Sequence, residues 1–229
     1  MAHSRRQRQL ALHLATHGGA RRGAGRKPAG ARPGVAHARR PAVTVHRPVH
    51  VTLRTLDHVW NLRSRRCFRV IAHALAIARD TSPMRVVHFS VQGNHLHLVC
   101  EAASAEALAA GVKGLSVRIA RGLNRVMDRS GPVFADRYHA HVLRSPGEVR
   151  RTLAYVLGNF ASHARRRGER VPAKWVDPFS SAGLAASALD VVSPPRSWLL
   201  RNVARHGAER HDRGAEARVN PPAAGVPSS

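Results

Sequence analysis

The sequence has few cysteines and no long apolar run, and each absence excludes a class of protein. Its two cysteines, Cys67 and Cys100, form no CxxC pair, which argues against a disulfide-stabilised fold and favours a reducing compartment. No apolar run reaches the ~18 residues that a membrane span requires. The arginines near the N-terminus precede only a short apolar stretch, interrupted by His13, which is too weak for a signal peptide. We therefore expect a cytoplasmic, nucleoid-associated protein with no membrane partner.

Acidic residues are scarce as well. The chain has 13 Asp and Glu against 38 Lys and Arg, a formal net charge of +25 at pH 7. A charge this large repels itself and usually has an acidic partner. We expect that partner to be DNA, because neutralised phosphates release counterions and provide affinity that does not depend on base sequence. Compositional drift and an anionic membrane surface are the alternatives on charge alone.

Composition divides the 229 residues into four segments. Residues 1–40 contain ten Lys or Arg and no acid, and we predict a disordered basic arm. Within it, Gly25-Arg26-Lys27-Pro28 is similar to the short basic hooks that enter minor grooves, so Arg26 and Lys27 are candidate DNA contacts; a plain basic tail is the alternative. The remaining predicted segments are a folded domain, a loosely packed extension and a disordered tail, over residues 41–167, 168–202 and 203–229.

Apolar spacing predicts four strands and three helices in the folded domain. Alternating apolar residues predict a first strand over residues 43–53, interrupted by Pro48. Further strands are predicted over residues 84–91, 95–101 and 133–143.

Helical spacing predicts one helix over residues 65–80, a second after Ser104, and a third after Ser145 with Pro146 in its first turn. The order is strand, helix, strand, strand, helix, strand, helix. It predicts an α+β fold, a ferredoxin-like antiparallel sheet with helices on one face, plus an added C-terminal helix.

Two histidines alternate along the predicted third strand, in the run His95-Leu96-His97-Leu98. Because strand side chains alternate between faces, both imidazoles point one way and both leucines point into the core. Two imidazoles at this spacing form half of a metal site and need a third ligand. The alternative is a pair of histidines that is hydrogen-bonded or faces solvent.

The last predicted helix carries Tyr155 and Asn159 four residues apart, and therefore on one face. This face lies off the apolar stripe that includes Val156 and Phe160. It presents a hydroxyl beside an amide oxygen. An ordinary exposed helix tyrosine is the alternative interpretation.

Taken together, these residues predict one reaction. A metal held by His95, His97 and Asn159 would polarise a phosphate oxygen. Tyr155, one helical turn from the third ligand, could then attack phosphorus and form a phosphodiester that stores the bond energy for rejoining.

The same residues resemble a known family, the single-tyrosine HUH transposases, in particular the REP-associated tyrosine transposases. HUH denotes His-hydrophobic-His, and the resemblance covers about residues 41–167. Two further motifs carry it, Phe134-Ala-Asp-Arg-Tyr138-His139 and Arg150-Arg-Thr-Leu-Ala-Tyr155-Val-Leu-Gly-Asn159. Many members place a proline after the amide residue, where this chain has Phe160.

The resemblance implies a ferredoxin-like domain that binds Mg²⁺, or Mn²⁺, through His95, His97 and Asn159. It implies a transposase that cleaves and rejoins single-stranded DNA next to a hairpin, with a 5′-phosphotyrosine on Tyr155 and a free 3′-hydroxyl. The expected partner is single-stranded or hairpin DNA, and the expected state is a monomer or a homodimer.

Further DNA contacts are predicted at Arg137, Tyr138, Arg151 and Arg166. Tyr138 is the second tyrosine, and we favour Tyr155 as the nucleophile because only Tyr155 has an amide partner four residues on. One alternative function is a non-catalytic hairpin-binding protein with the same fold. A replication initiator or relaxase with the same chemistry is a third, disfavoured by the short chain.

Overall fold

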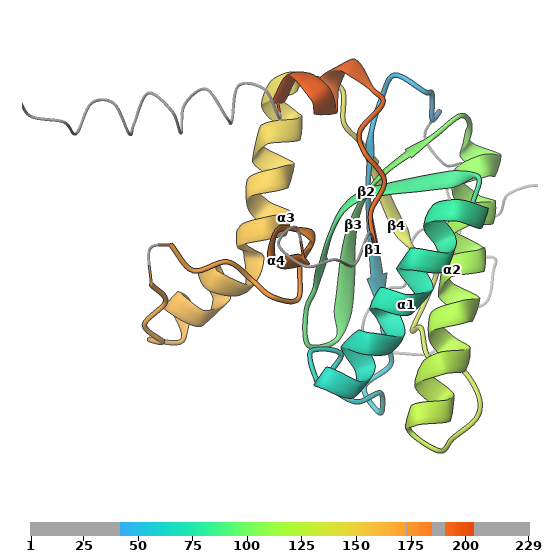
Figure 1. Cartoon of the computed structure of the whole chain (residues 1–229), viewed down its shortest axis with the longest axis vertical. Coiled ribbons are helices and arrows are strands. Elements are labelled where there is room, and N and C mark those ends of the chain that lie inside the picture. Colours follow the sequence, from blue (N-terminus) through green and yellow to red (C-terminus); the bar gives the residue numbers. More distant parts are fainter. Residues whose placement is uncertain (1–41, 173, 185–190, 204–229) are drawn as a thin grey trace, which may run out of the picture. The chain divides into compact units, whose positions relative to one another are not determined.

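The computed structural model describes residues 42–172, 174–184 and 191–203; the predicted basic arm and most of the predicted tail lie outside these residues. Four antiparallel strands form one sheet in the order β2-β3-β1-β4 (Figure 1). They are β1 (Val49–Arg54), β2 (Met84–Val91), β3 (His95–Ala102) and β4 (His139–Val142). With the helices between them, this is the ferredoxin-like arrangement, and the predicted α+β class is confirmed.

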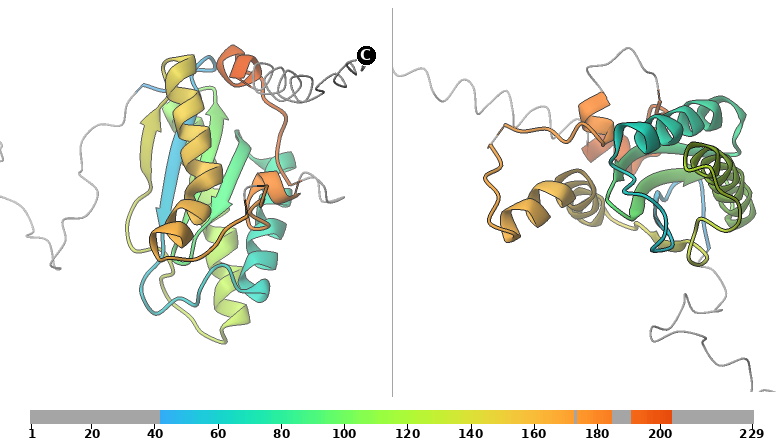
Figure 2. Two further views of the ribbon diagram at one scale, coloured as in Figure 1. Left: turned by 90° about the vertical axis from the view of Figure 1, so that its left-hand side faces the viewer. Right: turned by 90° about the horizontal axis from the view of Figure 1, so that it is seen from below.

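The helices cover both faces of the sheet (Figures 1 and 2). α1 (Arg65–Thr81) and α2 (Ala105–Val126) pack on one face, over the side chains of Val51, Leu96 and Leu98. α3 (Pro146–Arg166) lies against the other face. There a smaller core joins its apolar side chains to the sheet, through Val87, Val99, Leu143, Val149, Val156, Leu199 and Leu200.

Local chemistry sets where the helices begin. The hydroxyl oxygens of Ser64, Ser104 and Ser145 each accept a hydrogen bond from a backbone N–H in the first turn of α1, α2 and α3. Strand boundaries differ more from the sequence prediction. β1 begins after Pro48, which lacks the N–H that a strand needs, and β4 is shorter than predicted, since Phe134 makes only an isolated bridge with Thr55.

The described part of the extension packs along β2, the edge strand. α4 (Ser181–Leu184) follows a bridge between Ser180 and Ser90, and further along the chain Ser193 N–H donates to the Val86 carbonyl. These contacts use the unpaired backbone groups of an edge strand, which offer hydrogen bonds that composition does not reveal.

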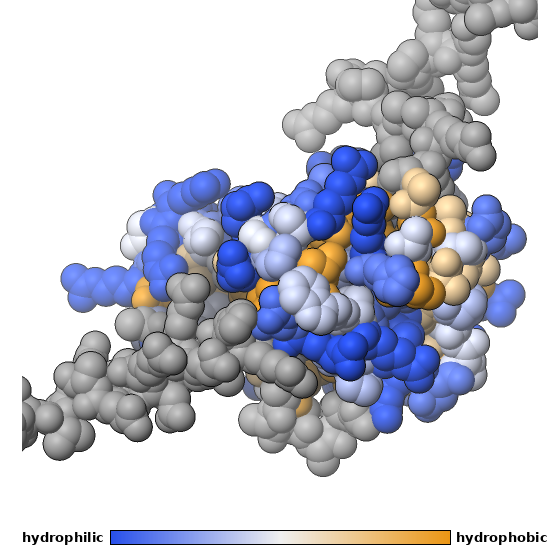
Figure 3. All heavy atoms as spheres, turned by 90° about the horizontal axis from the view of Figure 1, so that it is seen from above, coloured by the Kyte–Doolittle hydropathy of each residue, from blue (hydrophilic) through white to orange (hydrophobic). Residues whose placement is uncertain are grey.

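Hydrophilic side chains predominate on the end of the molecule seen from above, with hydrophobic side chains visible between them (Figure 3). No helix among the described residues has the length and apolar character of a membrane span.

Candidate active site

The two histidines of β3 lie side by side on the face of the sheet that α3 covers. Leu96 and Leu98 point into the opposite core and are fully buried, so the predicted alternation is observed. The Nε2 atoms of His95 and His97 are 3.1 Å apart, and the two rings are nearly perpendicular. His97 is 3% exposed, so its orientation is held by its surroundings.

Hydrogen bonds at the far side of each ring orient these nitrogens. His95 Nδ1 lies 2.9 Å from Asn94 Oδ1, and His97 Nδ1 lies 3.1 Å from His50 Nε2 and 3.2 Å from Thr52 Oγ1. When one Nε2 carries a proton, the contact between the two Nε2 atoms is itself a hydrogen bond; when the protons are on both Nδ1 atoms, two Nε2 lone pairs face each other. Such lone pairs repel, and a cation between them removes the repulsion.

His50 and Thr52 were not predicted from the sequence. Both lie on β1, and Thr52 is the direct partner of His97 in the antiparallel register of β1 and β3. Alternation along β1 places the two side chains on one face. That signal is present in the sequence, but the pairing of β1 with β3 is needed before it points to His97.

Tyr155 comes to the histidine pair from α3. Its ring centroid lies 5.2 Å from that of His97 and 6.1 Å from that of His50, in edge-on arrangements. Its side chain is 51% exposed. The phenol is therefore adjacent to the imidazoles and open to a substrate at the same time.

Asn159 lies one turn further along α3 and is 3% exposed. Its Oδ1 atom is buried and has no hydrogen-bond partner among the described residues. An unsatisfied buried polar atom costs roughly 1–3 kcal/mol. The amide oxygen is therefore available to a bound group, and a cation is one that would bind it.

His163 lies a further turn along α3, which puts Tyr155, Asn159 and His163 in one row at four-residue spacing. Its charge is among the causes that lower the pKa values of His95 and His97. The sequence prediction did not include it. Spacing along the helix could have found it, since it continues the row from Tyr155 through Asn159.

Burial keeps the imidazoles of the site neutral. It is the largest cause of the lowered pKa of His97, about 3, and of His50, about 4, with neighbouring histidines adding to both shifts. Burial, and then the charges of Arg54 and His163, also lower the pKa of His95. Neutral imidazoles are the form that donates a lone pair to a metal.

The donor set fits a divalent cation in octahedral coordination. Two ligands about 2.1 Å from an octahedral ion, in neighbouring positions, are about 3.0 Å apart, and the two Nε2 atoms are separated by 3.1 Å. Within the described residues, no three His, Cys, Asp or Glu side chains form a metal site. The buried amide oxygen of Asn159 on α3 is a candidate third ligand of another type.

The predicted DNA contacts fall into three groups. Arg137, Arg151 and Arg166 are exposed, and Arg151 lies one turn before Tyr155 on α3. Tyr138 is 8% exposed and belongs to the main core, so it has little surface to offer to DNA. Arg26 and Lys27 lie outside the described residues.

No protein-family model and no curated protein sequence matches the chain. Among solved structures it is similar to a REP-associated tyrosine transposase bound to a REP hairpin, with 14% identity and a TM-score of 0.49 over 70% of this chain and 92% of that one. It is also similar to a candidate transposase from Deinococcus radiodurans, with 14% identity and a TM-score of 0.38 over 51% of this chain and 94% of that one.

Proposed function

We propose that this chain is a DNA transposase that cleaves and rejoins single-stranded DNA beside a hairpin, with Tyr155 as the nucleophile. The observation that carries the proposal is the position of the Tyr155 ring, 5.2 Å from His97, whose Nε2 faces that of His95 at 3.1 Å. A nucleophile, a pair of neutral nitrogen donors and a buried amide oxygen thus lie within one small region of α3 and the sheet. The net charge of +25 supports a nucleic-acid substrate.

In the proposed reaction, the Tyr155 oxygen forms a bond to phosphorus and the bond from phosphorus to the 3′ oxygen breaks. The 5′ end of the DNA is then joined to the tyrosine, and the released 3′ oxygen takes up a proton. The phenol proton passes to solvent, which reaches the half-exposed Tyr155 side chain. Rejoining is the reverse attack, by a 3′-hydroxyl on the phosphotyrosine.

His95, His97 and Asn159 would hold the divalent cation, Mg²⁺ or Mn²⁺. When bound, such an ion polarises a phosphate oxygen and stabilises the charge that develops on it. His50 and Thr52 would keep His97 in the tautomer whose Nε2 is free, because both lie within hydrogen-bond distance of His97 Nδ1. Arg151, exposed one turn before Tyr155, would contact the DNA backbone.

A covalent trapping experiment tests this function, and the chain offers a matched control because it has only two tyrosines. Purified protein is incubated with Mg²⁺ and a single-stranded oligonucleotide that carries a hairpin. The label lies 3′ of the cleavage point, in the fragment whose 5′ phosphate would be joined to the tyrosine. We expect a labelled protein band with wild type and with Tyr138→Phe, and none with Tyr155→Phe. An adduct that persists in Tyr155→Phe would refute the assignment of the nucleophile.

The alternative, a non-catalytic hairpin-binding protein, is resolved by the same experiment. It predicts salt-dependent binding of the oligonucleotide without an adduct in any variant. It also predicts that His97→Ala leaves the affinity nearly unchanged. The proposed enzyme would form an adduct that His97→Ala abolishes.

A further inference from the structure

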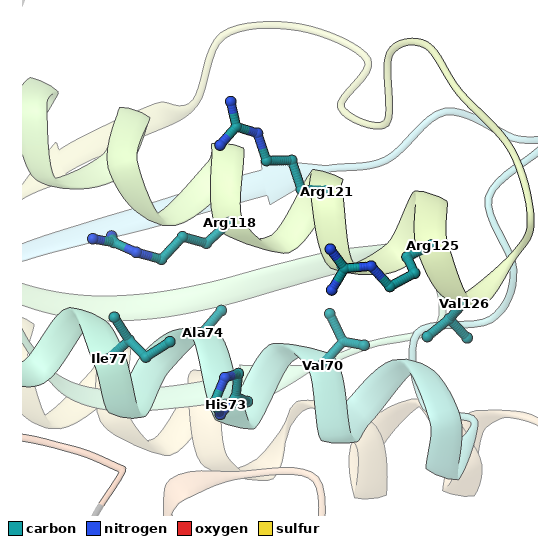
Figure 4. A pocket seen from close by; sticks show the side chains of 9 residues that line it. Val70, His73, Ala74, Ile77, Arg118, Arg121, Arg125 and Val126 are labelled. Atoms are coloured by element: carbon teal, nitrogen blue, oxygen red, sulfur yellow. The ribbon is translucent and has the colours of Figure 1, made fainter.

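A groove is lined by residues of α1 and α2, the two helices that Figure 1 shows on the face of the sheet opposite α3, and Figure 4 shows its side chains from close by. Its volume is about 360 Å³, and its floor is apolar, formed by Val70, Ala74, Ile77 and Val126. Figure 4 shows Arg118 and Arg125 extending along it from α2. The candidate active site uses neither this groove nor its residues.

Arginine dominates the charge of this groove and its continuation along α1. Five arginines line the two adjoining parts: Arg66, Arg69, Arg118, Arg121 and Arg125. No acidic side chain is among the lining residues, all of which belong to the described part of the chain. Arg66, Arg69, Arg121 and Arg125 are exposed, and Arg118 is half-buried, with one guanidinium nitrogen donating to Thr81 Oγ1 at 3.2 Å. Guanidinium groups gathered on one surface with no acid among the lining residues form a site for an anionic partner.

Close packing of α1 against α2 fixes the shape of the groove. A Cβ atom at Gly122 would lie 2.4 Å from Val70 Cγ1, so the contact between α1 and α2 requires glycine here. Both helices are also anchored in the main core through their buried sides, α1 by residues such as Ile71 and α2 by residues such as Leu123. The groove is therefore formed before any partner binds.

We propose that this groove binds the phosphate backbone of duplex DNA. Arg118 and Arg125 are seven residues apart, a rise of about 10.5 Å along the helix, and the charges of one DNA strand are spaced about 3.4 Å apart along the duplex axis. The backbone positions that carry the two flexible side chains are thus separated by about three phosphate steps, so the two guanidinium groups can reach separate phosphates of one strand. Each guanidinium presents a planar fork of donors that fits a phosphate.

The lining favours a duplex over a single strand. Proteins that bind single strands stack bases on aromatic side chains, and the lining residues include no Phe, Tyr or Trp. Paired bases need no such platform, because the duplex keeps them stacked internally. The inference rests on the proposed function only in taking DNA as the partner, since the duplex site and the Tyr155 site lie on opposite faces of the sheet.

Fluorescence anisotropy with a short duplex, closed at both ends so that no single strand is exposed, tests the proposal. The groove variant is Arg118→Gln with Arg125→Gln. Its matched control, Arg47→Gln with Arg170→Gln, removes the same charge from exposed positions outside both sites. We expect the groove variant to bind the duplex about tenfold more weakly. The slope of log affinity against log salt should fall by about two, because two fewer phosphates are neutralised.

The control variant should change duplex affinity by less than about twofold. Thermal melting by circular dichroism checks that both variants fold. Tyr155→Phe should bind the duplex as wild type does. The groove variant should still form the covalent adduct when the single-stranded substrate is saturating. These two results together separate duplex binding in the groove from the proposed catalytic function. Equal duplex affinity for the groove and control variants would overturn the proposal. Binding of poly-glutamate is measured in the same way. A groove variant that loses affinity for poly-glutamate and not for the duplex would also overturn the proposal, because an acidic protein would then be the partner.

Discussion

Arg63 and Asp177 form a buried ion pair that ties the extension to the folded domain. Two guanidinium nitrogens of Arg63 donate to the two carboxylate oxygens of Asp177, each at 2.9 Å, and the Asp177 side chain has no exposed surface. Arg63 also donates to the Val91 carbonyl, and its guanidinium stacks on Phe160 of α3 at 3.5 Å and on Phe179 at 4.4 Å. One side chain thus joins the segment before α1, the end of β2, the helix that carries Tyr155 and the extension.

Removing one partner of this pair should destabilise the fold strongly. Asp177→Ala leaves a buried guanidinium without its counter-charge, and we expect it to lower the free energy of unfolding by about 3–5 kcal/mol. Urea denaturation measures the effect. The control is Glu169→Ala, which breaks the exposed pair with Arg167 and should cost less than about 1 kcal/mol. Similar small losses in both variants would show that the buried pair does not hold the extension.

Two helix glycines should respond to alanine in opposite directions. A Cβ atom at Gly158 of α3 meets nothing within 4 Å, so Gly158→Ala should stabilise the protein by up to about 1 kcal/mol through helix propensity. At Gly122 of α2 the new Cβ would collide with Val70, and Gly122→Ala should destabilise. Thermal unfolding of both variants checks the signs. A less stable Gly158→Ala would contradict the open space found beside it.

The start of α3 should depend on pH through Glu148. Its carboxylate accepts hydrogen bonds from the Arg144 backbone N–H at 2.7 Å and from His141 Nε2 at 2.6 Å, and these, the backbone bond first, lower its pKa. A carboxyl whose pKa is lower in the folded state stabilises the fold above its unfolded pKa and loses that effect as the pH falls through the folded pKa. Glu148→Gln should therefore lower the melting temperature by more at pH 7 than at an acidic pH below the ordinary pKa of a glutamate. Glu169→Gln is the control, and an equal deficit at both pH values would contradict the prediction.

Local chemistry accounts for the parts of this fold that the sequence predicted well. The start of α3 follows from Ser145 and Pro146 because the groups that cap a helix are its near neighbours in the chain. In the same way, His95 and His97 share a face because they are two residues apart on a strand, and Tyr155 and Asn159 because they are four apart on a helix.

Interactions between distant segments account for what the sequence did not predict. His50 reaches His97 only because β1 pairs with β3, and Arg63 reaches Asp177 across 114 residues. Strand pairing and the docking of the extension depend on the whole packed structure. The predicted fourth strand was too long for the same reason, since the apolar residues near Phe134 are held by the core and not by the sheet.

His50 should act as a positioning residue for the proposed cation site. Its Nε2 lies 3.1 Å from His97 Nδ1, so it can hold the proton there and keep His97 Nε2 free for the cation. We expect His50→Ala to weaken Mn²⁺ affinity about tenfold, within the usual range for such outer partners, while His50→Gln, whose amide oxygen can accept the same hydrogen bond, should restore much of it. Electron paramagnetic resonance of free Mn²⁺ measures this without any catalytic step. His139→Ala, an exposed histidine on neighbouring β4, should bind Mn²⁺ like wild type. Equal Mn²⁺ affinity for His50→Ala and wild type would show that His50 does not orient His97.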